Sequence, residues 1–511
     1  MHALAEVIDG HAARTPDAPA FLVGAERTTW SQYAARSGAL AAALLRADLA
    51  PGERVAVLLP DGADVHAAFV ATEKAGLVAV GIGPRAGEGE IRHLIARSGA
   101  RALLSLATHR ELDTRALVAK GDLPLRRHLV LDPEASLPPP TDAERRALGG
   151  RRLAPDALWL LNSTSGTTGL PKCVTHDQAR WNHFHRLAVE AADLSAEDVF
   201  LSALPAPFGF GLWTAHFTPT LLGAPCVLLP DFDARELVRA IERHRVSVLA
   251  AVSTQFILML DALDAGDVSS LRVLFTGGEA VPYERAAAFE DATSARVLQF
   301  YGSNETGALS RTTLCDSRDV RLRSAGRVIP EMRVRLFDEA GKDVTRGGRG
   351  VPGCRGPLTS AGYWNDPEAN AKLYTADGWM LTGDLAEIDA EGVLRVVGRT
   401  ADVIIRGGKN ISAPVVEGAV LAHPAVSLAA AVPVPDPVFG ERVCAVVSLH
   451  PGEALTLEAL IAFLREGGLS VESLPERLVV MDELPRASGG KIAKGALREE
   501  IARRFAPAED R

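Results

Sequence analysis

The 511-residue sequence predicts an α/β protein with a large N-terminal domain of two doubly covered sheets plus a β-rich subdomain, followed by a small α+β C-terminal domain. Up to about Gln299, short apolar runs alternate with helix-like stretches, which is typical of parallel sheets covered on both faces. Residues 326–398 instead show short strands among many glycine and proline turns, which indicates an antiparallel subdomain. A chain of this length is also too long for one core.

The alternation begins with the Ala/Leu-rich stretch 30–46, an expected helix, and the apolar run 54–59, an expected strand. Residues 123–153 are rich in proline and arginine, so we expect an exposed connection there. The boundary between the two domains is placed at Asp402, giving domains 1–401 and 402–511. The other expected helices are 65–75 and 90–98, and the other expected strands are 78–80, 102–105, 158–162, 199–203, 226–229, 248–252 and 273–276.

Composition narrows the class of protein. Apolar residues make up 47% and charged residues 23%, a balance typical of soluble globular proteins, and the net charge of -9 argues against a nucleic-acid partner. The start of the chain does not resemble a signal peptide, and the most apolar run, 246–260, is too short to span a membrane. The five cysteines are scattered, which fits neither a disulfide framework nor a zinc site. We therefore expect a cytoplasmic enzyme, and the sequence leaves a homodimer open.

Residues 161–172, L-N-S-T-S-G-T-T-G-L-P-K, form the most informative segment. Its glycines allow the backbone to approach a ligand closely, its hydroxyls and amides donate to phosphate oxygens, and its lysine adds a positive charge. The segment is not a Walker A loop, because Leu170 and Pro171 separate the second glycine from the lysine, and a G-x-S-x-G nucleophile elbow is absent. The expected phosphate-binding residues are Thr164, Ser165, Gly166, Thr167, Thr168, Gly169 and Lys172.

Further motifs follow in a fixed order, and together they resemble those of the adenylate-forming superfamily, which includes acyl- and aryl-CoA ligases, peptide-synthetase adenylation domains and beetle luciferases. Residues 164–172 resemble its phosphate loop, 301–307 its Y-G-x-T-E motif, 382–384 its T-G-D motif, and 485–491 its P-x-x-x-x-G-K segment. The resemblance covers almost the whole chain. It implies an ATP-dependent ligase that activates a carboxylic acid and releases pyrophosphate.

The resemblance also implies residue roles. Lys491 would be the catalytic lysine that stabilises charge on the reacting phosphate, Glu305 would help hold Mg²⁺, and Asp402 would be the hinge about which the C-terminal domain rotates. Asn304 stands where the family usually has threonine, and its amide would still donate to a phosphate oxygen. Tyr301 would flank the adenine, and Asp384 and Arg399 would contact the ribose. The other expected nucleotide-binding residues are Gly278, Glu279, Ala280, Gly302 and Thr306.

Two segments are expected to shape the acyl pocket, 276–280, which resembles the family's G-G-E/A loop, and the aromatic segment 208–213. Neither segment carries a lysine or arginine, which favours an uncharged, hydrophobic acyl group. Packing of these aromatic residues in the core is the alternative interpretation. The expected pocket residues are Phe208, Phe210, Trp213, Gly277, Gly278 and Gly302.

The acceptor is the less defined half of the reaction. Residues 404–411 resemble the stretch that lines the pantetheine tunnel in CoA ligases, where Gly407 and Gly408 would let a thin thiol chain pass. Relatives then commonly read I-x-P-x-E-[VI]-E, whereas this chain has its proline displaced by one position and Val415 in place of the inner glutamate. CoA is the first choice of acceptor, with an amine, an amino acid or a carrier protein as alternatives. A non-catalytic, binding-only relative is disfavoured by the presence of Lys491, Asp384 and Glu305.

Overall fold

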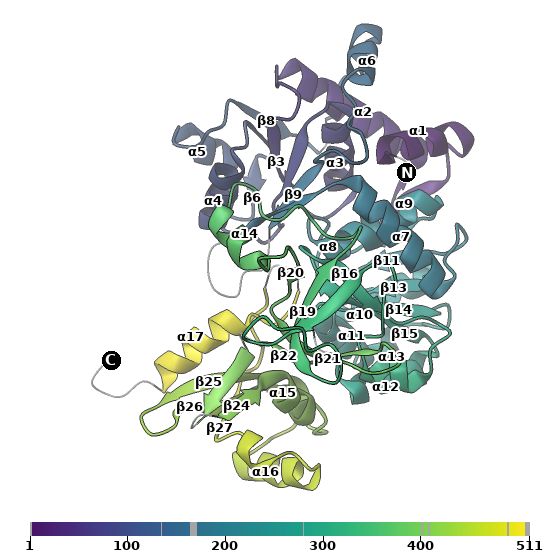
Figure 1. The fold of residues 1–511 in the computed structure, drawn as a ribbon. Coiled ribbons are helices and arrows are strands. Elements are labelled where there is room, and N and C mark those ends of the chain that lie inside the picture. The colour runs from purple at the N-terminus through teal and green to yellow at the C-terminus, as the bar shows by residue number, and fades with distance from the viewer. Residues whose placement is uncertain are drawn as a thin grey trace.

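The computed structural model describes residues 3–133, 135–163, 171–279, 281–399, 402–406, 409–487 and 490–505, with Arg399 and Asn410 described by their backbone alone. Within these residues the chain forms four main β-sheets flanked by helices (Figure 1). Two large sheets and an antiparallel sheet precede Asp402, and the fourth sheet follows it. This arrangement confirms the predicted α/β fold with its additional β-rich part.

The largest sheet has nine strands, and its six central strands (β15, β14, β13, β11, β12 and β1) are parallel. Antiparallel strands extend it at both edges. In spatial order the strands are β17 (Arg327–Val328), β16 (Gly307–Arg311), β15 (Arg296–Ser303), β14 (Val273–Thr276), β13 (Val248–Ala250), β11 (Phe200–Ser202), β12 (Cys226–Leu228), β1 (Pro19–Val23) and β2 (Glu26–Thr29).

The second sheet has six strands, of which β10 at one edge is antiparallel to the others. Its order is β10 (Cys173–His176), β9 (Leu160–Ser163), β4 (Val78–Gly81), β3 (Arg54–Leu58), β5 (Ala102–Leu106) and β8 (Arg127–Leu131). The helices of this part of the chain are α1 (Leu4–Arg14), α2 (Trp30–Arg46), α3 (Ala63–Lys74), α4 (Glu88–Ser98), α5 (Thr114–Ala119), α6 (Asp142–Gly149), α7 (Gln178–Ala192), α8 (Gly209–Gly211), the π-helix η1 (Leu212–Phe217), α9 (Thr218–Leu222), α10 (Ala234–His244), α11 (Ser253–Leu260), the 3₁₀ helix η2 (Leu263–Ala265), α12 (Tyr283–Thr293) and α13 (Arg318–Arg323).

The third sheet is wholly antiparallel, as the turn-rich sequence predicts. It consists of β18 (Arg333–Phe337), β19 (Arg349–Arg355), β20 (Met380–Leu381), β21 (Asp384–Ile388) and β22 (Leu394–Arg399), with helix α14 (Pro367–Leu373) nearby in the chain. The C-terminal sheet consists of β24 (Lys409–Ser412), β23 (Val403–Arg406), β26 (Gly440–Leu449), β25 (Val426–Asp436) and β27 (Arg477–Val480). Its helices are α15 (Ala413–Leu421), α16 (Leu457–Glu466), the 3₁₀ helix η4 (Val471–Ser473) and α17 (Lys494–Arg504).

Local sequence explains both a confirmed element and a wrong prediction. Helix α2 starts at a capping box in which the Thr29 hydroxyl accepts from the Gln32 N–H and the Gln32 side chain accepts from the Thr29 N–H. The exposed connection predicted for residues 123–153 is wrong in part, because β8 extends the six-stranded sheet and α6 begins at a second capping box, between Thr141 and Glu144. Both elements bury few side chains, so their apolar periodicity is weak.

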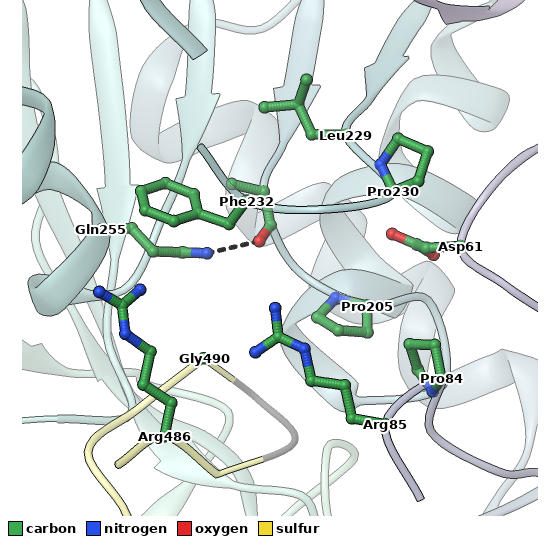
Figure 2. Close-up of a pocket in the computed structure, with 11 residues that line it drawn as sticks. Asp61, Pro84, Arg85, Pro205, Leu229, Pro230, Phe232, Gln255, Arg486 and Gly490 are labelled. Atoms are coloured by element: carbon green, nitrogen blue, oxygen red, sulfur yellow. Dashed lines mark hydrogen bonds between the residues drawn. The ribbon is translucent and has the colours of Figure 1, made fainter. Parts of the chain in front are cut away.

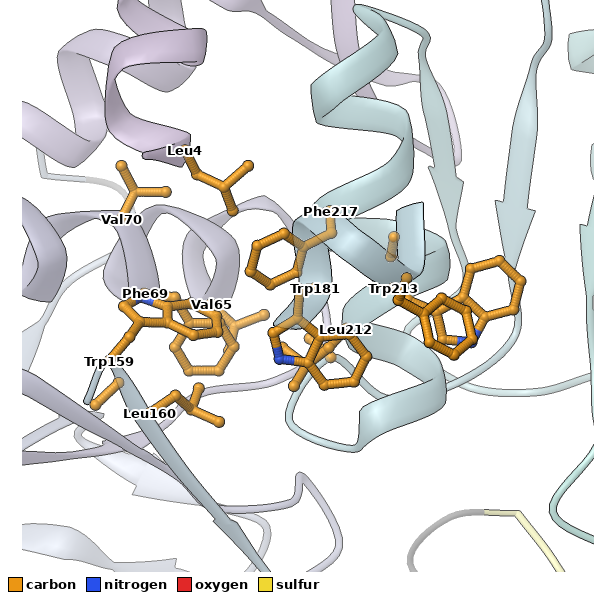
Figure 3. Close-up of a cluster of buried hydrophobic side chains, with 14 of the residues drawn as sticks. Leu4, Val65, Phe69, Val70, Trp159, Leu160, Trp181, Leu212, Trp213 and Phe217 are labelled. Carbon is orange, nitrogen blue, oxygen red and sulfur yellow. The ribbon is translucent and has the colours of Figure 1, made fainter. Parts of the chain in front are cut away.

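Aromatic side chains on helices and strand ends of the two large sheets pack together in one core (Figure 3). Trp159 precedes β9 and meets Phe217 of η1 edge to face, with 5.2 Å between ring centroids. Phe69 of α3 packs on the same tryptophan at 6.1 Å. Phe69 and Phe217 are fully buried, and burying such a side chain contributes about 1.5–3 kcal/mol. This core fixes the strand ends of the two sheets relative to each other.

A second core joins the C-terminal sheet to the nine-stranded sheet. Leu428 and Val432 of β25 and Leu497 of α17 belong to the same buried cluster as Phe256 of α11 and Phe289 of α12. The C-terminal part therefore rests on helices that follow β13 and β14. That position carries the segment after β27 towards the carboxyl ends of those strands.

Candidate active site

Three of the loops that carry predicted motifs leave the carboxyl ends of parallel strands in the two large sheets, where ligands of open α/β sheets bind. Strand β9 leads into the phosphate loop, whose residues 164–170 lie outside the described residues, as do Ala280, Gly407 and Gly408. Strand β14 leads into Gly277 and Gly278, and β15 ends in the segment that carries Glu305. Two sheets and the C-terminal segment thus contribute to one region.

Lys491 reaches this region from the C-terminal part of the chain. Its ammonium donates to the Gly278 carbonyl at 2.7 Å. Gly278 has a φ of 77°, and a Cβ there would stand 2.6 Å from the Lys491 Nζ, so the close approach requires glycine. The backbone of the lysine is also held, since the Ala487 N–H donates to the Lys491 carbonyl at 2.7 Å. The structure therefore brings the predicted catalytic lysine to the predicted G-G-E loop, although they are 213 residues apart.

Glu279 follows Gly278 and lies next to the same lysine. Burial raises the pKa of its carboxyl, and the positive charge of Lys491 acts in the opposite direction. The Thr254 N–H, at the start of α11, donates to this carboxylate at 3.4 Å. A lysine and a half-buried carboxylate therefore lie side by side at the end of β14.

Tyr301 and Asp384 meet across the junction of two sheets. The Tyr301 hydroxyl donates to the Asp384 carboxylate at 2.7 Å, which connects the end of β15 to the start of β21. Asp384 is paired in register with Arg399 on β22. The three residues expected around the adenosine are thus brought together, with the side chain of Arg399 outside the described part.

Glu305 is oriented by a residue that motif reasoning missed. The Tyr363 hydroxyl donates to the Glu305 carboxylate at 2.7 Å, and the Lys172 ammonium lies 4.9 Å from the centre of the Tyr363 ring. Burial and the neighbouring carboxylate raise the pKa of the Tyr363 hydroxyl, so it stays a donor. None of the motifs identified in the sequence contains Tyr363, and its place beside two charged residues appears only in three dimensions.

The Glu305 carboxylate suits a Mg²⁺ ion whose remaining ligands are oxygens of the substrate phosphates and water. In the described residues no group of three metal-ligating side chains occurs. Mg²⁺ is commonly bound by one or two carboxylates together with phosphate oxygens and water, so Glu305 alone is a sufficient protein ligand of that type. The buried hydroxyl of Thr306, another expected nucleotide-binding residue, donates to the Gly307 carbonyl and accepts from the Ser303 N–H within the turn.

In the aromatic segment predicted for the acyl pocket, one residue is buried in the core and two are partly accessible. Trp213 is 4% exposed and lies against Phe275 and Phe300, with ring centroids 4.9 Å and 5.6 Å away. Phe210 stacks on Trp213 at 5.5 Å and remains half-buried, as does Phe208. Core packing therefore accounts for Trp213, whereas the two phenylalanines are the partly accessible members of the wall.

A small cavity lies between the C-terminal segment and the loops of the two large sheets (Figure 2). It measures about 20 Å³, room for roughly one water molecule, and Arg85 from the loop after β4 and Arg486 from the C-terminal segment border it. Burial lowers the pKa of Arg486, and the charge of Arg85 lowers it further. Asp61 borders the same cavity, accepts from the Ala206 N–H at 3.0 Å, and has its pKa raised by burial to about 7.

Because the pKa of Asp61 is raised, we expect the stability of the folded chain to depend on pH. An acid whose pKa is higher in the folded chain contributes stability that is complete below its unfolded pKa and is lost as the pH rises through about 7. Asp61→Asn keeps the acceptor for Ala206 but has no proton to lose. We expect its melting temperature to exceed that of the unmodified chain by a margin that grows between about pH 5 and about pH 8. Melting curves that stay parallel over this range would refute the assignment, and the exposed substitution Asp482→Asn is the control.

Asp402 is held by helix α17. Its buried carboxylate accepts from Lys494 at 3.4 Å and from Arg498 at 2.5 Å, and Lys494 also pairs with Glu417 of α15 at 2.8 Å. In the region where the sequence departs from its relatives, Glu417 therefore links α15 to α17. Val415 is 52% exposed, so the displaced pattern leaves an apolar side chain on the surface.

Two global features bear on the chain's setting. None of the helices in the described ranges is both long and apolar enough to cross a membrane. All five cysteines lie within those ranges and are unpaired, and Cys315 alone among them is exposed.

Comparison with known proteins gives consistent matches over nearly the full length. The family model of AMP-binding enzymes matches residues 8–364, and that of the AMP-binding enzyme C-terminal domain matches residues 415–491. A salicylyl-CoA synthase / salicylate adenylyltransferase from Streptomyces is 33% identical, covering 95% of this chain and 91% of the relative. A 2-hydroxy-7-methoxy-5-methyl-1-naphthoate–CoA ligase from Streptomyces carzinostaticus is 32% identical, over 96% and 92% of the two chains. The structure is similar to that of an amide bond synthetase from Marinactinospora thermotolerans, with a TM-score of 0.82, 28% identity and coverage of 98% and 99%.

Proposed function

The chain belongs to the family of AMP-binding enzymes, and from this premise we propose that it activates a hydrophobic aromatic acid with ATP and transfers the acyl group to CoA. One observation supports the first step above all others. The Lys491 ammonium stands 2.7 Å from the Gly278 carbonyl, beside the loops that leave β9, β14 and β15. A cation brought from the C-terminal part to that point suits the stabilisation of charge on a reacting phosphate.

In the first step an oxygen of the substrate carboxylate attacks the α-phosphorus of ATP, and the bond to the bridging oxygen of pyrophosphate breaks. Lys491 stabilises the negative charge that develops on the attacked phosphate, and Lys172 with the phosphate loop holds the departing group. Tyr301, Asp384 and Arg399 bind the adenosine. Glu305 would hold Mg²⁺, which neutralises phosphate charge when it is bound.

In the second step the acceptor thiol attacks the acyl carbon, AMP leaves with the electron pair of the broken bond, and the thiol proton is released. We propose that the C-terminal domain, beginning at Asp402, rotates between the steps and brings Gly407 and Gly408 to the acceptor. The ion pairs of Asp402 with Lys494 and Arg498 support this, because they make Asp402 move with α17. Asp402 stays the proposed hinge.

The acid class follows from the pocket wall and from the relatives. The pocket segments offer aromatic rings and no lysine or arginine, which suits an acid without a second charge. Two relatives are named for salicylate and for a naphthoate. A cytoplasmic location agrees with the five unpaired cysteines, since disulfides are rare in a reducing compartment. The homodimer stays a prediction.

Amide formation is the second candidate, and the similarity to an amide bond synthetase favours including it. A single assay separates the alternatives: pyrophosphate release and product mass are measured over a panel of aromatic and fatty acids with CoA, with an amine, or with no acceptor. We expect pyrophosphate with at least one aromatic acid and a thioester when CoA is added. An amide without a thioester would replace the proposed acceptor.

A further inference from the structure

Asn304 stands where the family usually has threonine, and its side chain is hydrogen-bonded to the 208–213 segment that is expected to shape the acyl pocket. Its Oδ1 accepts from the Gly209 N–H at 3.1 Å and from the Asn162 Nδ2 at 3.3 Å. Asn162 also donates to the Pro207 carbonyl at 3.1 Å. Asn162 lies on β9, just before the phosphate loop, and Pro207 and Gly209 flank Phe208. One amide oxygen thus connects the acyl wall to the strand that carries the phosphate loop.

A buried arginine and histidine close this network. Arg180 donates to the Asn304 carbonyl and to the His176 Nδ1, both at 2.9 Å, and the His176 Nε2 donates to the Asn162 Oδ1 at 2.7 Å. Burial lowers the pKa of His176, and the charge of Arg180 adds to that effect, so the ring is neutral and accepts at Nδ1. Burial also lowers the pKa of Arg180, to about 10, which leaves the guanidinium charged at neutral pH.

The network restricts movement of the Phe208–Phe210 segment, which forms the wall of the expected acyl pocket. Arg180 is 3% exposed, and its hydrogen bonds to Asn304 and His176 act together with the charges of Asp177 and Glu305 to offset the cost of burying the guanidinium. A Cβ on Gly209 would stand 2.2 Å from the Asn304 Oδ1, with its next contacts at an ordinary 3.4 Å. The Asn304 side chain therefore occupies the space that a larger residue at position 209 would need.

We infer that Asn304 is a positioning residue that fixes the Phe208–Phe210 wall of the acyl pocket relative to Glu305 and to the start of the phosphate loop. Its Oδ1 holds the wall. Its Nδ2 has no hydrogen-bond partner among the residues whose placement is described, so that group stays available to a ligand. The inference rests on the proposed function for its catalytic consequence, but the clash between positions 209 and 304 can be tested without any activity.

A compensation experiment tests the contact itself. Gly209→Ala should lower the melting temperature and reduce kcat/KM for the acid by about tenfold or more, since overpacking and small displacements of a reacting group are both costly. In the Asn304→Ala background the same substitution should change kcat/KM by less than about threefold, because the clashing oxygen is gone. If Gly209→Ala does not fold alone, recovery of folded protein in the double variant is the same result.

Gly38→Ala is the matched control, because a Cβ at that helical glycine meets nothing within 4 Å and should be tolerated. An equal cost of Gly209→Ala in both backgrounds, in melting temperature and in kcat/KM, would overturn the inference. Because the melting temperature needs no turnover, this failure is distinguishable from a failure of the proposed function.

The pattern of Michaelis constants separates positioning from general stability. Asn304→Ala should raise KM for the acid by about tenfold and KM for ATP by less, since it releases the wall. Asn304→Asp retains the acceptor for the Gly209 N–H but lacks the Nδ2 donor, so it should keep KM for the acid within about threefold while raising KM for ATP. Equal changes in the two constants for both variants would contradict a role in holding the wall.

Discussion

Replacing Lys491 with alanine is expected to lower the rate of adenylate formation by about 10²–10³-fold. The ammonium reaches the Gly278 carbonyl, 213 residues away in the sequence, and so lies beside the loop that leaves β14. The charge on the α-phosphate grows as the carboxylate attacks, and a preorganised cation is worth most when charge develops. Transfer of the acyl group from a supplied acyl-adenylate to the acceptor should be nearly unchanged, because no phosphate is attacked in that step.

The separation of the two half-reactions is the decisive part of this prediction. Pyrophosphate release reports the first, and thioester formation from synthetic acyl-adenylate reports the second. Lys372→Ala removes an exposed lysine of α14 and should leave both rates unaltered. Equal loss in both half-reactions would point to a disturbed fold, and survival of both would show that Lys491 is not the catalytic lysine.

Replacing Glu305 with glutamine should give the second largest effect, a fall in kcat of about 10²-fold together with a higher Mg²⁺ concentration for half-maximal activity. Glutamine keeps the size of the side chain but removes the negative charge, and a neutral amide is a poorer ligand for a hard dication. Adenylate formation measured across a Mg²⁺ titration gives both quantities.

Tyr363→Phe tests the orientation of that carboxylate separately from its charge. The variant loses the 2.7 Å hydrogen bond to Glu305 but keeps the ring beside Lys172. We expect a change in the same direction as for Glu305→Gln but only about fivefold to tenfold in kcat, in line with the loss of one charged hydrogen bond. A Mg²⁺ requirement that is unchanged in both variants would remove the metal role of Glu305.

The sequence predicted much of the fold because apolar periodicity was strong where elements are buried. The helix expected at residues 30–46 has those bounds in the structure, since a capping box marks its start. Strand β8 and helix α6 were missed because each buries few side chains, although the Thr141–Glu144 capping box was present as a signal. Exposure weakens the pattern on which such predictions depend.

In the candidate site, the residues that lie in motifs were predictable, and those that act through a three-dimensional contact were not. Motifs predicted Lys491 and the Gly277–Gly278 loop as separate parts of the site, since both segments are short and of particular composition. The contact between them appears only in the structure. They could not predict Tyr363 or Arg180, because single residues of common type carry no local signature and gain their role from a three-dimensional contact. Asn304 was noticed as a departure, but its bond to Gly209 depended on the fold.

Trp213 marks a further limit. The sequence could not distinguish a pocket aromatic from a core aromatic, because both are large and apolar and both occur beside glycines. The structure places Trp213 in the core against Phe275 and Phe300 and leaves Phe210 at its edge.

Formation of an acyl-adenylate is measured most directly by acid-dependent exchange of labelled pyrophosphate into ATP, which needs no acceptor. We predict exchange with at least one hydrophobic aromatic acid, no exchange when the acid is omitted, and its loss in Lys491→Ala. Absence of exchange with every acid of a panel that spans aromatic and fatty acids would contradict the account.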